Sequence, residues 1–521
     1  EAGIRDCLRG LVGSEMCIRD RVFWPALTVV VAAIVPLILF PDQSAAVLNR
    51  VMSFITHNLG FVFMWFTAGA LGSLLWFAFG RYGTVRFGGQ DAEPEFRYLS
   101  WIGMLFCAGI GTSLLYWATI EWVYYYQAPP FGIEAGSAEA AHWAAMYGLF
   151  HWGPRAWALY CLPALPIAYA FHNRKIPFLR ISQACRGVIG DRADGALGKI
   201  IDVLFIFGLV GGTGTSLGLG TPILSESIST LTGIERTFAL DAFVIVVWTA
   251  IFGTTVYLGM EKGIKRLADA NVYLGFFLLA FVLFFGPTVF ILDTFTNSLG
   301  LLATNFLKMS FYTDPVGGSG FPQTWTVFYW AWWIAYAPFM GLFVARISRG
   351  RTIREVVAAN LVWGSLGCWL FFAAFGNTAL HDQLNGTVPV IEIMNETSPQ
   401  AAIVAVVNAL PMGTFILILF VAMAFIYSAT TLQASAYTIA SVASRELVAG
   451  ESEPLRWNRL FWALALGGMA VALMYLGGLK PLQTASLIVA LPLVFVISLC
   501  VWSFLRWLKE DQVGNPPRGG R

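Results

Sequence analysis

Charge is scarce in this chain of 521 residues: 12% are Asp, Glu, Lys or Arg, while 57% are hydrophobic. A soluble domain carries roughly 25% charged residues, so this composition excludes a fully water-facing surface and makes lipid the expected solvent. The net charge is only +2, and the basic residues are scattered through short loops. We therefore expect a lipid bilayer as partner, and no nucleic acid, which would need a basic face.

Patterns typical of metal sites and zinc proteases are also lacking. The seven cysteines stand alone, without a CxxC pair, and no histidine spacing completes a tetrahedral metal site. The five histidines form no HExxH motif, which zinc proteases need. We expect no metal, no cofactor and no catalytic residues.

The first 21 residues, EAGIRDCLRGLVGSEMCIRDR, lack an initiator Met and the periodicity of an anchor helix. They resemble read-through of a sequencing adapter, so residues 1–21 are interpreted as a non-native leader and set aside. We expect this leader to pack against nothing. We expect residues 22–510 to form a single transmembrane domain, and 511–521 a short tail.

Long apolar runs dominate the domain. A helix needs about 20 apolar residues to cross the ~30 Å hydrocarbon core, and about twelve such runs occur. They begin near Phe23, Leu59, Ser100, Ala144, Ile200, Ala242, Val272, Trp325, Val356, Ala402, Leu460 and Leu487. The predicted fold class is an all-α integral membrane protein with about twelve transmembrane helices.

Basic residues alternate between the loops and indicate the orientation. Loops on one side hold only Arg50, Arg236, Lys308 and Lys480, and almost all other lysines and arginines fall on the opposite side. Positive residues are retained in the cytoplasm, so we predict a multi-pass inner-membrane protein with both termini cytoplasmic. Between two spans, NSLGLLATNFLKMS has apolar residues at helical spacing and is expected to lie flat at the interface.

Two glycine-rich stretches interrupt the apolar helices. In CAGIGTS, Cys107 to Ser113, we expect Gly109 and Gly111 to allow the helix to unwind. Irregular backbone at membrane depth is tolerated only where it is buried or lines a cavity, so this break marks a candidate site. The stretch GLVGGTGTSLGLGTP, Gly208 to Pro222, permits either close helix packing or exposed carbonyls, and the sequence leaves both open.

Aromatic residues recur at helical spacing inside two spans: Trp152, Trp157 and Tyr160 in one, and Trp332, Trp333 and Tyr336 in another. Membrane Trp and Tyr are usually interfacial anchors, but two facing stripes would form an aromatic cage. Such a cage suits a trimethylammonium group, which donates no hydrogen bonds yet is attracted to ring faces by about 2 kcal/mol or more when desolvated.

Charged residues within the spans are candidates for function, because burying them is costly. They are Glu121, Arg155 and Asp202. Glu121 lies one turn before Tyr124 and Tyr125, so it is expected either to face the cage or to reach the headgroups at a helix end.

These residues carry a resemblance to the betaine/choline/carnitine transporter family over residues 22–510. WTVFYWAWWIAYAPFMGLFVARISRGRTIREVV, Trp325 to Val357, is similar to the family signature, and FHWGPRAWALY and GGLKPLQTASLI also resemble family sequences. The resemblance implies a LeuT-like five-plus-five inverted repeat after two extra helices, alternating access around a midplane site, and a homotrimer. A channel, or a sensor of the same fold, is distinguished from a carrier by a flux assay.

The resemblance also implies site residues. The substrate cage would comprise Tyr124, Trp152, Trp332 and Tyr336, with Trp333 on a neighbouring face and Trp325 near an outer, transient site. Within the family, YYYQAPPFG, SLGLGTP and FYTDP are most similar to the L-carnitine/γ-butyrobetaine antiporter. The expected substrate is therefore a quaternary ammonium compound of the carnitine, betaine or choline kind.

On ion coupling, the sequence resembles both the antiporter and the sodium symporters of the family. In the antiporter, Met and Arg side chains occupy the places of two sodium ions; Met340 matches the first, and Lys265 stands at the second. Thr430 and Thr431 align with the hydroxyl pair that binds sodium in the symporters. We favour exchange without sodium, and the alternative is a symporter of glycine betaine, choline or a related onium compound with sodium as coupling ion.

Overall fold

The computed structural model describes residues 18–109, 111–258, 261–445, 453–475 and 480–511, with the backbone alone at 107–109, 255–256, 258, 261–268, 480–483 and 485. Across these residues the chain is helical, and strand-like pairing is limited to two isolated bridges, Ile18 with Ser444 and Arg86 with Thr352. The prediction of an all-α protein is confirmed.

Ten α-helices make up the first half of the described chain. They are α3 (Asp20–Leu39), α4 (Pro41–Phe79), α5 (Tyr98–Gly109), α6 (Ser113–Gln127), α7 (Ala138–His151), α8 (Pro154–Ala168), α9 (Ile181–Ala184), α10 (Arg186–Ile189), α11 (Ala196–Thr232) and α12 (Phe238–Leu258). A π-helical turn, η1 (Tyr169–Asn173), extends α8, and a short 3₁₀ turn, η2 (Gly190–Ala193), follows α10.

The second half contains eleven more. They are α13 (Glu261–Phe285), α14 (Thr288–Ser310), α15 (Val327–Ile347), α16 (Ile353–Ala358), α17 (Ser365–Phe371), α18 (Asn377–Asn385), α19 (Val390–Glu396), α20 (Pro399–Ala409), α21 (Gly413–Val442), α22 (Arg456–Tyr475) and α23 (Lys480–Glu510). The π-helical turn η3 (Pro322–Thr326) leads into α15, while η4 (Ala359–Gly364) and η5 (Phe372–Gly376) join α16, α17 and α18.

Eight helices of the described chain are long and apolar enough to cross a membrane, or nine if one bent pair is counted as a span. The third and fourth predicted spans are each broken into two helices, α5 with α6 and α7 with α8. The tenth begins at Gly413 rather than near Ala402, because residues Pro399–Ala409 form the separate helix α20. Several membrane-crossing helices are therefore present, and the count of twelve stays a prediction.

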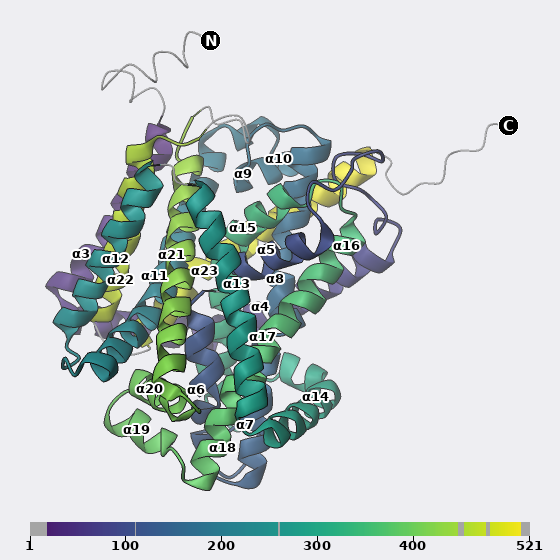
Figure 1. Ribbon diagram of the computed structural model, residues 1–521. Coiled ribbons are helices and arrows are strands. Elements are labelled where there is room, and N and C mark those ends of the chain that lie inside the picture. The colour runs from purple at the N-terminus through teal and green to yellow at the C-terminus, as the bar shows by residue number, and fades with distance from the viewer. Residues whose placement is uncertain (1–17, 110, 259–260, 446–452, 476–479, 512–521) are drawn as a thin grey trace.

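Loops that were predicted to share one side of the membrane do lie together. The amide of Phe87 donates to the carbonyl of Arg351 at 3.0 Å, and Arg174 forms an ion pair with Glu510 at 2.9 Å. In Figure 1, α9, α10 and the end of α23 lie at one end of the bundle, and α14, α18 and α19 lie at the other. The alternation of basic loops thus matches the contacts of the fold.

Helix α14 contains the segment expected at the interface. It follows α13 after a two-residue break and is bent by 107° from it, so it runs across the end of the bundle (Figure 1). Its exposed side carries Leu292, Leu299 and Leu307. This direction and these leucines fit a helix that lies along a membrane surface.

The expectation that residues 1–21 pack against nothing is wrong for residues 18–21, while their interpretation as a non-native leader stays a prediction. Ile18 pairs with Ser444, and Arg19 Nη1 lies 2.6 Å from a carboxylate oxygen of Asp202, which is fully buried in α11. Residues 20 and 21 already belong to α3. The guanidinium of Arg19 compensates the buried Asp202 charge, which explains why this stretch is held; residues 1–17 lie outside the described chain.

Candidate substrate site

The first break in the bundle separates α5 from α6. Gly111 and Thr112 are not helical, as expected for Gly111, whereas Gly109, also expected to be unwound, is the last residue of α5. A side chain at Gly111 would place its Cβ 3.2 Å from Thr431 Oγ1 of α21, and Thr112 Oγ1 donates to the carbonyl of Ala424 at 3.1 Å. Glycine therefore lets the unwound backbone approach α21 closely.

The second break, between α7 and α8, was not predicted. Trp152 and Gly153 lie outside both helices, and Pro154 occupies the first position of α8, where a missing amide hydrogen costs nothing. A Cβ at Gly153 would lie 2.5 Å from the carbonyl oxygen of Leu149, so this position requires glycine. The break places Trp152 in the core, where it is 2% exposed.

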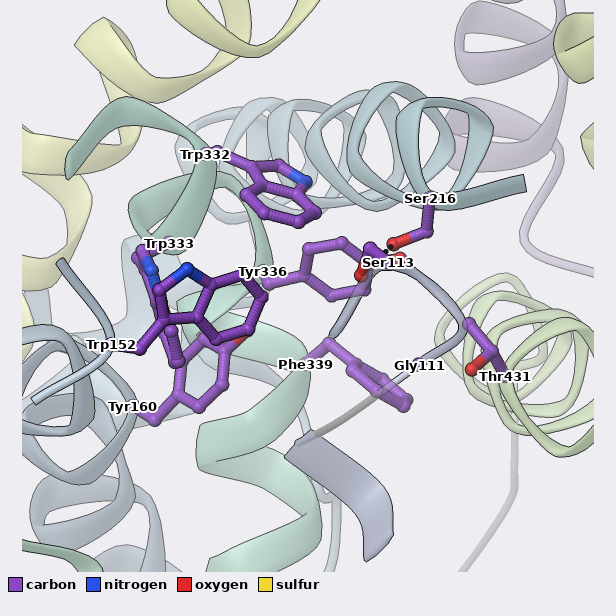
Figure 2. A pocket seen from close by; sticks show the side chains of 10 residues that line it. All are labelled: Gly111, Ser113, Trp152, Tyr160, Ser216, Trp332, Trp333, Tyr336, Phe339 and Thr431. Atoms are coloured by element: carbon purple, nitrogen blue, oxygen red, sulfur yellow. Dashed lines mark hydrogen bonds between the residues drawn. The ribbon is translucent and has the colours of Figure 1, made fainter. Parts of the chain in front are cut away.

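A small cavity of about 20 Å³ lies between the two breaks and α15. Its lining comprises Gly111, Ser113, Trp152, Tyr160, Ser216, Trp332, Trp333, Tyr336, Phe339 and Thr431. Figure 2 shows Trp152, Trp333 and Tyr160 together on one side, the hydroxyls of Ser113, Ser216 and Thr431 on the other, and Tyr336 between them. The cavity thus has an aromatic end and a hydroxyl end.

The aromatic end is built from edge-to-face and tilted ring contacts. The Trp152 ring centroid lies 5.7 Å from that of Trp332 and 5.4 Å from that of Trp333, and Tyr160 lies 4.5 Å from Trp333. Within the described chain, the indole nitrogens of Trp332 and Trp333 and the hydroxyl of Tyr336 have no hydrogen-bond partner. The structure therefore brings together three of the four predicted cage residues, Trp152, Trp332 and Tyr336, together with Trp333, which was expected on a neighbouring face.

The hydroxyl end comes from three helices. Ser216 Oγ of α11 donates to Ser113 Oγ of α6 at 3.4 Å, and Thr431 of α21 lies against Gly111. The glycine-rich stretch 208–222 is continuous helix, with Gly212 packed against the Tyr336 ring. Of the two possibilities left open for this stretch, close packing is the correct one.

Tyr124, which the family resemblance placed in the central cage, does not line the cavity. Its ring lies 4.8 Å from that of Trp325, and its hydroxyl is 3.0 Å from that of Tyr116. Tyr124 and Trp325 form a second aromatic cluster with Trp117. The structure therefore places Tyr124 with Trp325 and not in the cavity, and the outer, transient site expected near Trp325 stays a prediction.

Glu121 neither lines the cavity nor reaches a helix end in solvent. It is 0% exposed and accepts hydrogen bonds from the Tyr125 hydroxyl at 2.6 Å, from Trp152 Nε1 at 3.1 Å and from the Tyr329 hydroxyl. Both expectations for Glu121 are therefore corrected. Its carboxylate lies behind Trp152 and contacts the cavity wall from outside.

The residues expected to govern coupling are only partly at the cavity. Thr431 lines it, whereas Thr430 donates to the carbonyl of Tyr427 at 2.9 Å and does not. Met340 is fully buried in α15 and does not line it either. Lys265 lies on α13, but its side chain is outside the described residues.

Four lining residues were not in the predicted set: Ser113, Tyr160, Ser216 and Phe339. Tyr160 had a signal, since it shares the helical spacing of Trp152 and Trp157. The serines had none that separates them from other buried serines. Ser216 also stands in a GxSxG pattern, Gly214 to Gly218, but in the middle of a continuous helix and not at the strand-to-helix turn that hydrolases use.

Comparison with known sequences identifies the family. The model of the betaine/carnitine/choline family transporter matches residues 21–513. The chain belongs to this family. It is similar to the uncharacterized transporter YeaV of Escherichia coli (strain K12), with 37% identity over 448 residues, covering 86% of this chain and 92% of that protein. It is therefore a multi-pass secondary transporter of the betaine/carnitine/choline family.

Among solved structures, a likeness is found to the substrate-bound, outward-open state of a Na⁺-coupled sialic acid symporter. Identity is 13%, coverage is 85% of this chain and 86% of that one, and the TM-score is 0.47.

Proposed function

We propose that this protein carries a quaternary ammonium compound of the carnitine/γ-butyrobetaine type, by alternating access in the inverted-repeat architecture of its family. The observation that supports this is the aromatic end of the cavity, where Trp152, Trp332, Trp333 and Tyr160 present rings without a carboxylate in the lining. A trimethylammonium group is attracted to such faces and loses no hydrogen bonds on leaving water. An amine would lose several, so the cavity favours the methylated cation.

The hydroxyl end suits the other half of such a substrate. Ser113, Ser216 and Thr431 supply donors near the broken helix, and a carboxylate or hydroxyl group accepts hydrogen bonds from them. A zwitterion with its onium group among the rings would therefore extend toward α21. Carnitine and γ-butyrobetaine have this shape.

Competition binding tests this substrate class. We expect L-carnitine, γ-butyrobetaine, glycine betaine or choline to displace a labelled onium compound, and the corresponding primary amines to be at least tenfold weaker, since about 1.4 kcal/mol of extra desolvation is tenfold. Equal binding of an onium compound and its primary amine would contradict the proposal. Scintillation proximity on purified protein is the measurement.

Coupling is proposed to be exchange without sodium, with Met340 and Lys265 in place of the ions. One observation favours the alternative, a sodium symporter: the hydroxyls of Thr431, Ser113 and Ser216 gather at an unwound helix, where transporters also bind sodium. We predict that the double variant Met340→Val, Lys265→Gln gains sodium dependence of uptake. If uptake by the variant ignores sodium, the proposed substitution mechanism is wrong.

Assembly and location complete the proposal. We propose a homotrimer in the inner membrane, with both termini cytoplasmic. The grouping of basic loops at one end of the bundle supports the orientation (Figure 1). Accessibility of single cysteines to an impermeant reagent, at Arg86 on one side and Val316 on the other, tests it.

A further inference from the structure

Glu121 is a buried carboxylate that the proposed transport cycle does not yet use. It lies on α6 with no exposed surface. Its Oε1 accepts from Tyr125, and its Oε2 accepts from Tyr329 and from the indole nitrogen of Trp152. Trp152 is the cavity residue whose ring contacts both Trp332 and Trp333. A carboxylate is thus attached to the back of the aromatic wall.

The hydrogen bonds indicate an ionised carboxylate. An indole nitrogen can only donate, and the 2.6 Å distance from the Tyr125 hydroxyl is in the range of charge-assisted O–H···O⁻ bonds. His151 is the adjacent titratable group, with Nδ1 3.5 Å from Glu121. Its ring nitrogens already have neutral partners, the Tyr125 hydroxyl at 2.9 Å and Thr326 Oγ1 at 3.2 Å, so a neutral imidazole satisfies this geometry.

Arg155, the other buried charged residue of this region, does not form an ion pair with Glu121. Arg155 is 1% exposed, and its guanidinium donates to the carbonyls of Ser310 and Met64, both at 2.8 Å, and to Thr67. All three are neutral acceptors. The negative charge of Glu121 is therefore not cancelled by a direct partner among the described residues, and it acts on whatever the cavity holds.

We propose that Glu121 is a positioning and charge-selecting residue: it fixes Trp152 and places a negative charge behind the ring that receives the onium group. This rests on the proposed function and deepens it. A hydrogen bond from an indole to an anion polarises the ring, which strengthens its attraction for a cation on its face. The cavity then distinguishes N⁺(CH₃)₃ from a neutral group of the same shape.

The size of the effect follows from the separation. One indole width plus one van der Waals contact puts the charges about 8–10 Å apart, and at an effective dielectric constant near 20 the attraction corresponds to roughly fifteen- to thirtyfold in affinity. A merely structural role for Glu121 would weaken charged and neutral ligands alike. The ratio of the two affinities is therefore the decisive quantity.

The experiment compares two ligands on three proteins. The ligands are the onium compound that binds wild type best and its carbon isostere, in which C(CH₃)₃ replaces N⁺(CH₃)₃. The proteins are wild type, Glu121→Gln, which keeps an acceptor for Trp152 but removes the charge, and Glu396→Gln, an exposed carboxylate on α19 as matched control. We expect Glu121→Gln to weaken onium binding roughly fifteen- to thirtyfold while the isostere changes less than twofold, and the control to match wild type.

Every other outcome contradicts either charge selection by Glu121 or the proposed function. An equal loss for both ligands, or no loss for either, overturns charge selection by Glu121. A wild type that binds the isostere as well as the onium compound overturns the proposed function itself. If Glu121→Gln does not fold, Glu121→Asp is used: it keeps the charge, so the affinity ratio should stay within about twofold of wild type, and loss of that ratio contradicts the proposal.

Discussion

Trp332 is held on one side and free on the other. Its ring stacks parallel on Phe328, with centroids 5.9 Å apart, and also contacts Trp152 and Tyr329, while another part of its surface lines the cavity (Figure 2). The stacking fixes the ring before any ligand arrives, and a preformed wall reduces the ordering cost of binding. The aromatic end thus gains affinity from rigidity as well as from its cation–π faces.

We predict that Trp332→Ala or Trp152→Ala abolishes saturable uptake of a trimethylammonium substrate. Each loses a desolvated cation–π contact of about 2 kcal/mol, which alone is roughly thirtyfold. The assay is uptake into proteoliposomes with equal amounts of folded protein. Trp502→Ala, at an exposed position of α23 that is 63% exposed, is the control and should transport normally; normal transport by the cavity variants would refute the cage.

Gly212 offers a second test of the same wall. A Cβ there would lie 3.0 Å from two carbons of the Tyr336 ring. We therefore predict that Gly212→Ala pushes this ring into the cavity. Because such a displacement costs about 1–3 kcal/mol, KM should rise about tenfold or more. Gly72→Ala on α4 is the matched control, because nothing lies within 4 Å of its Cβ position. An unchanged KM for Gly212→Ala would show that Tyr336 does not set the cavity shape.

Among the elements, α4, α8 and the end of α14 are joined through one side chain. Arg155 of α8 donates to Met64 of α4 and to Ser310 of α14. Such a guanidinium satisfies carbonyls that would otherwise be buried without partners, and each lost partner costs about 1–3 kcal/mol. The interfacial helix is thereby fixed to a helix that lines the substrate cavity.

We predict that Arg155→Gln lowers the thermal midpoint in detergent markedly, with a loss of about 2–4 kcal/mol, and that Arg155→Lys restores only part of it, since an ammonium cannot reproduce the planar fork. Arg192→Gln, at an exposed position of η2, should leave the midpoint unchanged. A midpoint for Arg155→Gln equal to that of the control would mean that the three acceptors find other donors.

The breaks show how far local sequence predicts an element. Glycines at 109 and 111 predicted the interruption between α5 and α6, and the Gly153-Pro154 pair is an equally local signal for the break between α7 and α8. The orientation of Tyr124 could not be predicted, because α6 is buried on nearly every side and has no polar face to fix its rotation. Partners such as Trp325 decide it, and they are distant in sequence.

For the molecule as a whole, composition and the alternation of charge predicted an all-helical membrane protein with its basic loops together. Composition and charge alternation are summed over the whole chain, so an error at one place, such as the start of the tenth span, changes the predicted fold class little. The pairing of Glu121 with Trp152, or of Arg19 with Asp202, depends on packing between distant helices. Only the folded structure reveals such contacts, and the Glu121 contact is the one on which the proposed selectivity rests.

The decisive measurement is uptake of labelled L-carnitine into proteoliposomes, with and without internal γ-butyrobetaine, in sodium-containing and sodium-free buffers. We predict saturable uptake that requires internal γ-butyrobetaine and is unaffected by sodium. Uptake that needs only a sodium gradient would contradict the exchange mechanism and make Thr431 a candidate ion ligand. No saturable uptake of L-carnitine or any other quaternary ammonium compound, under any of these conditions, would contradict the account of the aromatic cavity as an onium site.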